Sequence, residues 1–303
     1  MSSRPLRVYL TGADGMLGTA LTAALDADPA TADWPLLGVS IKDFDIGDRA
    51  AVAASIDAFR PDVVVHTAAH AIVDDCEQDP AMALRVNVAG VRHVAEACRR
   101  TGARLIYLSS DYVFDGEHTP DRGYREEDLP APRSVYGLTK LAGERVAEMA
   151  PGHVNVRTSW LFGGVDERLD TVLSVVRGIQ RGERSRLIGG QFSCPTYTVD
   201  LARALVFLMT DGSDVTGTLH VTNQGSASWY QVASEIHALL GADAGLAPEP
   251  AFFEEAGFIG GRPRDSTLDT ARLRSIGFIL PSWQDAVARY CDTLVSTPVG
   301  GSR

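Results

Sequence analysis

Apolar runs of strand length alternate with segments of helical periodicity through the first half of the chain. The runs are LRVYLTG, WPLLGVS, DVVVHTAA, ARLIYLSS and HVNVRTSWLFG, and they are largely apolar throughout rather than alternating. Helices are predicted between them, from about residue 15, over 52–59, up to about 100, and over 134–149. Such strands separated by helices are typical of a parallel sheet buried on both faces. The sequence therefore predicts an α/β fold with a Rossmann-type doubly wound parallel sheet.

The pattern loosens after Gly163, where helices are predicted at 170–181, 198–209, 229–240 and 283–294 among loops rich in Gly and Pro. We expect residues 1–162 and about 196–222 to form an NAD(P)-binding Rossmann domain. Residues from about 163–195 and 223–303 are expected to form a smaller C-terminal α/β lobe that binds the substrate. Because ligands of such sheets bind at the carboxyl ends of the strands, functional residues are expected directly after strands.

Composition disfavours several classes of partner. The formal net charge of −11 and the isoelectric point near 5.1 oppose binding to phosphodiester backbones, so we expect no nucleic-acid partner. No apolar stretch approaches the roughly 18 residues of a membrane span, and the N-terminus lacks the apolar core of a secretory signal. The four cysteines are scattered without a CxxC pair, which indicates reduced packing residues. We therefore predict a cytoplasmic protein without a membrane partner.

A glycine-rich turn follows the first predicted strand. Gly12, Gly15 and Gly18 in TGADGMLG open the first predicted helix. Residues without Cβ atoms let the backbone approach a pyrophosphate, while a helix N-terminus presents free N–H groups and the positive end of its dipole. The position of the motif favours a dinucleotide site over a tight turn alone.

The end of the second predicted strand bears on the choice of cofactor. Enzymes that select NAD usually place a carboxylate there to bind the ribose hydroxyls. This chain instead has Ser40 and Lys42, which suit the extra phosphate of NADPH. Only two of the 28 Lys and Arg residues are lysines, so a lysine at this position is not explained by composition alone. The alternative to a role in cofactor binding is that Lys42 is an ordinary solvated surface residue. We expect NADPH to be favoured, with NADH possible.

Two further segments are candidates to border the cofactor. Asp45 and Ile46 follow the second strand, on the side expected for the adenine. Ala68 and Ala69 follow the third strand, and their side chains are small enough for close approach of a cofactor. Simple packing at the strand ends is the alternative for both segments.

Tyr136 and Lys140 form a YxxxK motif, which places both side chains on one face of a predicted helix. Reduction of a ketone delivers a hydride to carbon and a proton to oxygen, so it needs an acid beside the oxygen. Tyrosine can be that acid if its pKa falls from about 10 to about 7, to which an ammonium and the positive charge of a nicotinamide can contribute. Lys140 suits this role better than arginine, because an ammonium is compact and can join a proton relay. Ser110, at the end of the fourth strand, is our candidate to hydrogen-bond the substrate oxygen.

These motifs resemble the extended short-chain dehydrogenase/reductases, and specifically the dTDP-4-dehydrorhamnose reductase family, over almost the whole chain. The stretches that carry the resemblance are TGADGMLG, DFDIGD, HTAAHAIVDDCEQDP, SSDYVFDG, VYGLTKLAGE, RTSWLFG, GGQFSCPTY, SWYQVASEI and RPRDSTLDT. The resemblance implies an NAD(P)H-dependent enzyme that reduces the 4-keto group of a nucleotide-activated deoxysugar. It also implies that Tyr136 and Lys140 are the catalytic pair.

The same resemblance implies roles for individual residues, each of which we retain as an expectation. The pyrophosphate would meet Gly15, Met16 and Leu17. The adenosine part would meet Asp45 and Ile46, and the nicotinamide half would meet Ala69, His70 and Ala71. The sugar nucleotide would meet Ser110, Asp111 and Trp160, with Ser110 standing where the family often has threonine.

Three more expectations concern a charged anchor, metal and assembly. Arg262 in RPRDS resembles a late family motif, and its guanidinium suits a diphosphate, although an ion pair that holds the lobe is the alternative. One family member has a magnesium ion that bridges subunits through glutamates, but Thr19 and Ala20 occupy that region here. We therefore predict no metal. Relatives commonly pair, so a homodimer is possible.

Two other functions are consistent with the same motifs. The segment from SSDYVFDG to YREEDLPAP also resembles the regulatory beta subunit of methionine adenosyltransferase, which binds NADP and a partner protein. A sugar-nucleotide epimerase or dehydratase uses the same tyrosine and lysine but recycles its cofactor. A dehydratase would need a glutamate beside Ser110, where this chain has Asp111 and Tyr112. Net consumption of NADPH would separate a reductase from these alternatives.

Overall fold

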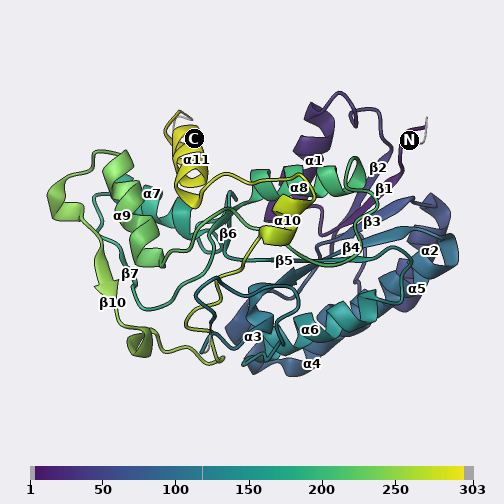
Figure 1. Cartoon of the computed structure of the whole chain (residues 1–303), viewed down its shortest axis with the longest axis horizontal. Helices are drawn as coiled ribbons and strands as arrows, with labels where there is room; N and C mark the ends of the chain where they lie inside the picture. The colour runs from purple at the N-terminus through teal and green to yellow at the C-terminus, as the bar shows by residue number, and fades with distance from the viewer. Residues whose placement is uncertain (1–3, 118, 297–303) are drawn as a thin grey trace.

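Six parallel strands form the central sheet of the computed structural model, which describes residues 4–117 and 119–296 (Figure 1). The strands are β1 (Val8–Thr11), β2 (Leu36–Val39), β3 (Val63–His66), β4 (Arg104–Ser110), β5 (Val154–Thr158) and β9 (Gly217–His220). They lie in the order β2-β1-β3-β4-β5-β9, and every neighbouring pair is parallel. The predicted doubly wound parallel sheet is therefore confirmed.

Helices cover both faces of this sheet. Figure 1 shows α1 (Met16–Ala27) and α8 (Thr198–Met209) on one face, and α2 (Arg49–Phe59), α5 (Val91–Thr101) and α6 (Val135–Ala147) on the other. The short helices α3 (Val73–Gln78) and α4 (Pro80–Leu84) and the π-helical turn η1 (Arg85–Gly90) connect β3 to α5. Each covering helix lies between two parallel strands along the chain, as the crossover connection of parallel strands requires.

Strand β1 shows how the sequence fills both faces. The side chains of Val8 and Leu10 pack in the core beneath α1 and α8, whereas Tyr9 packs in the core beneath α2 and α5. All three side chains are fully buried. Successive side chains of a strand point to opposite faces, so a strand between two helical layers must be apolar at every position. This is the physical reason for the continuous apolar runs.

A smaller group of elements lies at one end of the sheet (Figure 1). It contains two short parallel pairs, β6 (Leu161–Phe162) with β8 (Thr196–Tyr197), and β7 (Arg186–Ile188) with β10 (Glu249–Ala251). Helices α7 (Thr171–Gln180), α9 (Trp229–Leu239) and α11 (Trp283–Ser296) share an apolar core, and α10 (Ala271–Ser275) contacts β9. Short 3-10 turns are η2 (Asp111–Val113), η3 (Ala244–Leu246) and η4 (Phe253–Ala256). The division of the chain at about 162, 196 and 222 stays a prediction, and residues 297–303 of the predicted lobe lie outside the described residues.

Local interactions explain where the observed elements differ from the predicted ones. The helix predicted from Val52 begins at Arg49, because the Asp48 carboxylate accepts two backbone N–H groups of the first turn at 2.9 and 3.1 Å. The run HVNVRTSWLFG divides into β5 and β6 at Trp160, whose φ of 41° interrupts the extended backbone. Strands β7 and β10 have three residues each, and so short a segment has no periodicity by which a strand could be predicted.

Two further findings concern cysteine and the membrane. Cys76, Cys98, Cys194 and Cys291 are all buried and none forms a disulfide, as predicted for packing residues. Within residues 4–117 and 119–296, no helix combines the length and the apolar character needed to cross a bilayer.

A buried ion pair joins α6 to the sheet. Arg157 on β5 donates two hydrogen bonds to the carboxylate of Glu144 on α6, each 2.8 Å long. Ser109 on β4 donates a third, 2.6 Å long, and the side chains of Arg157 and Glu144 are only 3% and 2% exposed. Desolvation of two charges is costly, and their attraction offsets that cost only while both are present.

We predict that Arg157→Met lowers the free energy of unfolding by about 3–5 kcal/mol, because the Glu144 carboxylate stays buried without its counter-ion. Urea denaturation measures the change. The matched control is Arg145→Met on α6, because the exposed pair of Arg145 with Glu148 contributes at most about 1 kcal/mol. Equal losses in the two variants would contradict the assignment of this energy to burial.

Candidate active site

A cavity of about 950 Å³ opens along the carboxyl ends of β1, β3, β4 and β5. Most of the site residues predicted from the sequence lie in its wall. These residues are Gly12, Gly15, Met16, Leu17, Ser40, Asp45, Ile46, Ala68, Ala69, His70, Ala71, Ser110, Asp111, Tyr136, Lys140 and Trp160. The described wall does not include Lys42 or Arg262. Parallel topology explains the convergence, because it gathers the carboxyl ends of all strands at one edge.

Two glycines, one in the turn after β1 and one in the first turn of α1, satisfy packing requirements. Gly12 has a φ of 71°, in the left-handed region, and a Cβ atom there would lie 2.9 Å from the backbone nitrogen of Ala68. A Cβ atom at Gly18 would overlap the carbonyl oxygen of Gly12. These two positions therefore require glycine whether or not a ligand binds.

Gly15 is less crowded than Gly12 and Gly18. It is the N-cap of α1, and a Cβ atom there would make one tight contact with the described residues beyond its chain neighbours, 3.2 Å from the Gly12 carbonyl oxygen. No side chain caps this helix, and its first turn contains no acidic residue. An uncapped helix N-terminus in a cavity wall suits a diphosphate, because N–H groups and the helix dipole favour negative charge. The residues of this turn therefore fit NAD(P).

The residues at the end of β2 are engaged with nearby carboxylates. Ser40 lines the cavity, but its backbone N–H and its hydroxyl both donate to Asp43, at 2.8 and 3.3 Å. The exposed ammonium of Lys42 pairs with the Asp14 carboxylate at 3.0 Å. Asp14 itself lines the cavity. Lys42 therefore pairs with a residue that lines the cavity but does not itself line the cavity.

The predicted adenosine and nicotinamide segments are each fixed by one side chain. Asp45, next to the buried Ile46, accepts a 2.5 Å hydrogen bond from Arg85, a cavity residue that was not predicted. In the loop after β3, the backbone N–H of His70 donates to the Asn87 side chain at 2.8 Å. Asn87 returns a 2.9 Å hydrogen bond to the His70 carbonyl oxygen. These two hydrogen bonds therefore fix the backbone of the loop where it borders the cavity.

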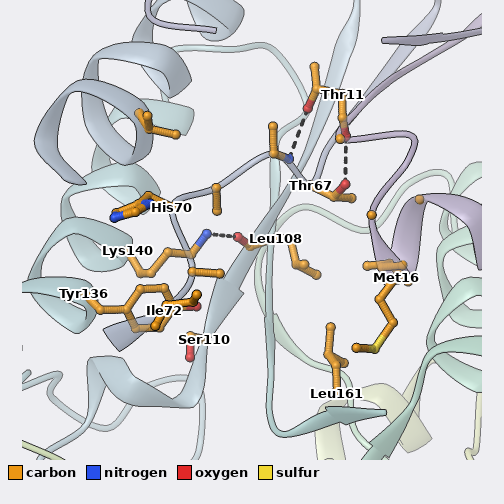
Figure 2. A pocket seen from close by; sticks show the side chains of 18 of the residues that line it. Thr11, Met16, Thr67, His70, Ile72, Leu108, Ser110, Tyr136, Lys140 and Leu161 are labelled. Atoms are coloured by element: carbon orange, nitrogen blue, oxygen red, sulfur yellow. Dashed lines mark hydrogen bonds between the residues drawn. The ribbon is translucent and has the colours of Figure 1, made fainter. Parts of the chain in front are cut away.

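Helix α6 carries the YxxxK pair into the cavity. Ser134 caps the helix by accepting a backbone N–H of its first turn at 3.1 Å. Figure 2 shows Tyr136 and Lys140 close together and beside Ser110, with Met16 across the cavity. The ammonium of Lys140 donates to the carbonyl oxygen of Leu108 on β4 at 2.5 Å (Figure 2). The helix spacing thus brings both groups to the end of β4.

Burial dominates the ionisation of this pair. It lowers the pKa of Lys140 to about 7, and the Glu144 carboxylate opposes that shift. Burial raises the pKa of Tyr136 well above its usual value, while a hydrogen bond with Ser110 lowers it. The acidic phenol expected from the sequence is therefore not a property of the chain alone, because desolvation disfavours a buried phenolate.

Hydroxyl groups surround the carboxylate of Asp111. It accepts hydrogen bonds from Ser110 at 3.0 Å, Ser159 at 3.0 Å, Ser193 at 2.8 Å and Ser266 at 2.5 Å. The residue is 1% exposed, although part of it lines the cavity. Both carboxylate oxygens therefore accept hydrogen bonds within the chain, and the contact of Asp111 with the sugar nucleotide stays a prediction.

Two further cavity residues, Trp229 and Thr158, were not predicted. Trp229, at the start of α9, stacks on Trp160 with ring centroids 4.5 Å apart and planes 8° apart. Thr158 ends β5, and its buried hydroxyl has no hydrogen-bond partner among the described residues. Its position at a strand end was the signal that could have identified Thr158. No such signal marks Trp229, which reaches the cavity from a distant segment.

Arg262 lies outside the cavity wall and takes part in an ion pair. One terminal nitrogen is 3.2 Å from the Asp74 carboxylate, and the guanidinium lies 4.1 Å from the centroid of the Phe258 ring. The other terminal nitrogen is buried without a partner in the described part of the chain. The ion pair considered as an alternative is thus present, and one donor remains unused.

Metal ligation has no candidate group in residues 4–117 and 119–296. No three His, Cys, Asp or Glu side chains there are arranged to hold a metal ion.

Known proteins resemble this chain over nearly its full length. The family model described as RmlD substrate binding domain matches residues 6–296. A dTDP-4-dehydrorhamnose reductase from Streptomyces griseus is 39% identical, over 98% of this chain and 98% of its own. A dTDP-4-keto-6-deoxy-D-glucose reductase from Streptomyces niveus is 37% identical, over 93% of this chain and 96% of its own.

A solved structure agrees with these sequence matches. It is a dTDP-4-dehydrorhamnose reductase from Bacillus anthracis str. Ames in complex with NADP, with a TM-score of 0.88 and 32% identity. The match covers 97% of this chain and 100% of the other. The chain therefore belongs to the dTDP-4-dehydrorhamnose reductase family and is an oxidoreductase of that family.

Proposed function

We propose that the protein reduces the 4-keto group of a dTDP-linked deoxysugar, with NADPH as the favoured hydride donor and NADH as an alternative. The observation that carries the proposal is the meeting of Tyr136, Lys140 and Ser110 in the cavity that the Gly15 turn borders. The two Streptomyces relatives described above are named for different 4-keto sugars, which supports the class of substrate rather than one sugar.

The proposed reaction needs a hydride on carbon and a proton on oxygen. Reduced nicotinamide supplies the hydride to the carbonyl carbon when it is bound. Tyr136 gives its hydroxyl proton to the carbonyl oxygen, so the C=O group becomes CH–OH and a phenolate remains. Lys140 stabilises that phenolate, because the attraction between opposite charges is strong in a buried site. Ser110 hydrogen-bonds the reacting oxygen, and a proton from solvent then restores Tyr136.

Binding of the two ligands is proposed to use opposite sides of the cavity. The cofactor lies along the first turn of α1, the loops after β2 and β3, and Lys140. The sugar nucleotide meets the stacked Trp160 and the free hydroxyl of Thr158. The unused nitrogen of Arg262 is the proposed donor to the diphosphate. Trp160 has a φ of 41° in the left-handed region, and its ring stacks on that of Trp229. The homodimer stays a prediction.

Replacement of the phenol tests the proposed acid. With a dTDP-4-keto-6-deoxy sugar and NADPH, we expect Tyr136→Phe to lower kcat about 10²- to 10⁴-fold, because the proton donor is lost. Absorbance of NADPH measures turnover, and fluorescence titration checks that the variant still binds NADPH. The matched control is Tyr230→Phe on α9, outside the cavity wall, which should keep normal turnover. Near-normal turnover of Tyr136→Phe would contradict the proposal.

Gly15→Ala tests the placement of the diphosphate. The new methyl group would make one tight contact, with the Gly12 carbonyl oxygen at 3.2 Å, so we expect only a small fall in the melting temperature. It would occupy space needed by the cofactor, so the Kd for NADPH should rise at least about tenfold, or about 1.4 kcal/mol. Gly190→Ala is the control, since a Cβ atom there has no neighbour within 4 Å. An unchanged Kd for Gly15→Ala would place the diphosphate elsewhere.

Lys42→Ala tests the preference for NADPH. If the ammonium leaves Asp14 to bind the extra phosphate, its loss should lower kcat/KM for NADPH about tenfold and leave NADH nearly unaffected. Because the site is exposed, the effect should shrink as salt is added. Asp14→Asn should act in the opposite direction, since it removes the carboxylate that competes for Lys42. Equal losses of kcat/KM with NADPH and NADH would show that Lys42 does not bind the extra phosphate of NADPH.

A further inference from the structure

The aromatic ring of Tyr107, on β4, lies against the ammonium of Lys140, yet the proposed reaction gives this ring no part. The ammonium nitrogen lies over the face of the ring, 4.5 Å from its centroid. The same nitrogen donates to the carbonyl oxygen of Leu108, the next residue of β4, at 2.5 Å (Figure 2). A cation within about 6 Å of the centroid of an aromatic face is attracted by the π electrons, most strongly where water is excluded. Since Tyr107 is 0% exposed and Lys140 is 3% exposed, little water screens this attraction.

The fold fixes the ring beneath the helix that carries Lys140. Tyr107 belongs to the apolar core on the face of the sheet that α2, α5 and α6 cover. A Cβ atom at Gly143 on α6 would overlap the Tyr107 hydroxyl, so the glycine lets the helix come close to the ring. The hydroxyl lies 3.5 Å from the carbonyl oxygen of Lys140, which is long for a hydrogen bond. The hydroxyl therefore contacts the backbone of Lys140, whereas the ring contacts its ammonium.

Three titratable groups act on the ammonium from inside the core. The carboxylate of Glu144, on α6, raises the pKa of Lys140 but is also hydrogen-bonded twice by Arg157 of β5. Cys76, on α3, acts in the same direction, but burial raises the pKa of that thiol to about 11, so it is uncharged at neutral pH. His66, on β3, has its pKa lowered to about 3, first by burial and then by the charge of Lys140, so it is neutral. Of these three groups only Glu144 is charged near pH 7, and Arg157 shares it.

The phenol and carboxylate groups nearest the cavity do not replace the ring. Burial raises the pKa of Tyr136, one helical turn before Lys140, well above its usual value, so this phenol is neutral in the chain alone. The carboxylate of Asp111, on η2, is engaged by four serine hydroxyls. Burial also raises the pKa of Tyr107 well above its usual value. Tyr107 therefore meets the ammonium as a neutral ring and not as a phenolate.

We propose that Tyr107 is a positioning residue, whose ring face holds the ammonium of Lys140 at the carboxyl end of β4 and keeps it charged. The inference rests on the proposed reduction, in which the charged ammonium stabilises the phenolate that Tyr136 becomes. The Leu108 carbonyl oxygen accepts one N–H group of the ammonium, and the ring attracts its charge, so other N–H groups stay available to the cavity. A carboxylate in place of the ring would cancel the charge that the phenolate needs.

The lysine content of the chain allows a direct test of the contact. Lys42 and Lys140 are the only lysines, so NMR of protein grown with lysine isotopically labelled at Cε shows one signal for each, and Lys42→Ala assigns them. The face of an aromatic ring shifts nearby protons upfield. We therefore expect the Cε protons of Lys140 to lie upfield of those of Lys42 in the wild type and in Tyr107→Phe, but not in Tyr107→Leu. No upfield shift in the wild type, or one that persists in Tyr107→Leu, would contradict the proposal.

Titration of the same signals with pH measures the charge of Lys140. Burial lowers the pKa of Lys140 to about 7 in the wild type, and Tyr107→Leu should lower it by about one further pH unit, because the buried cation loses its π partner. Tyr107→Phe keeps the ring, so its midpoint should match the wild type. The matched control is Tyr9→Leu, which removes a ring from the same core two strands away and should leave the midpoint unchanged. An equal or higher midpoint in Tyr107→Leu would overturn the proposal.

Turnover connects this measurement to the proposed reaction. The rate of reduction should fall as the pH rises and Lys140 loses its charge, and in Tyr107→Leu the midpoint of that fall should be about one pH unit lower. Tyr9→Leu should follow the profile of the wild type, and an unchanged midpoint in Tyr107→Leu would count against the role of the ring. Failure of the reductase proposal looks different, because the wild type would then turn over no dTDP-linked sugar while the NMR signal of Lys140 would still depend on Tyr107.

Discussion

A buried ammonium at the carboxyl edge of the sheet is the constraint on which the rest of the site depends. Lys140 is 3% exposed, and the one hydrogen bond described for its ammonium is to the Leu108 carbonyl oxygen. Burial lowers its pKa to about 7, because a charge in a low-dielectric interior loses its hydration. Glu144, one helical turn further along α6, opposes that loss, and Arg157 holds Glu144 in place. The buried pair of Arg157 and Glu144 therefore bears on the ionisation of Lys140 in the cavity.

The parallel topology places a second buried charge at the same edge. Asp111 follows β4 and accepts hydrogen bonds from serines at the end of β4, directly after β5 and in two loops of the smaller group of elements. The same hydrogen bonds thus tie these loops to the sheet and set the direction of the Ser110 hydroxyl. Burial is the largest cause that raises the pKa of Tyr136, and the charge of Asp111 acts in the same direction.

Local patterns in the sequence predicted the sheet, the first glycine turn and the helix face that carries Tyr136 and Lys140. They succeeded because burial on both faces requires continuous apolar strands, and because a spacing of four residues fixes one face of a helix. Contacts between distant segments could not be predicted in this way. Trp229 and the serines around Asp111 meet only through the tertiary fold.

Charge effects were harder still to predict, because they depend on burial and on the nearest partner. Lys42 pairs with Asp14 rather than lining the cavity, and the phenol of Tyr136 is less acidic in the chain alone than the motif suggested. The roles of the predicted site residues stay proposals, whereas their convergence on one cavity is a property of the fold.

Isotope transfer tests the central claim most directly. NADPH that carries deuterium in the transferable position of its nicotinamide is incubated with the protein and a dTDP-4-keto-6-deoxy sugar, and the product is analysed by mass spectrometry and NMR. The account predicts one deuterium at carbon 4 of the sugar for each NADPH oxidised. Conversion of the sugar without net loss of NADPH, or loss of NADPH without deuterium at carbon 4, would contradict it.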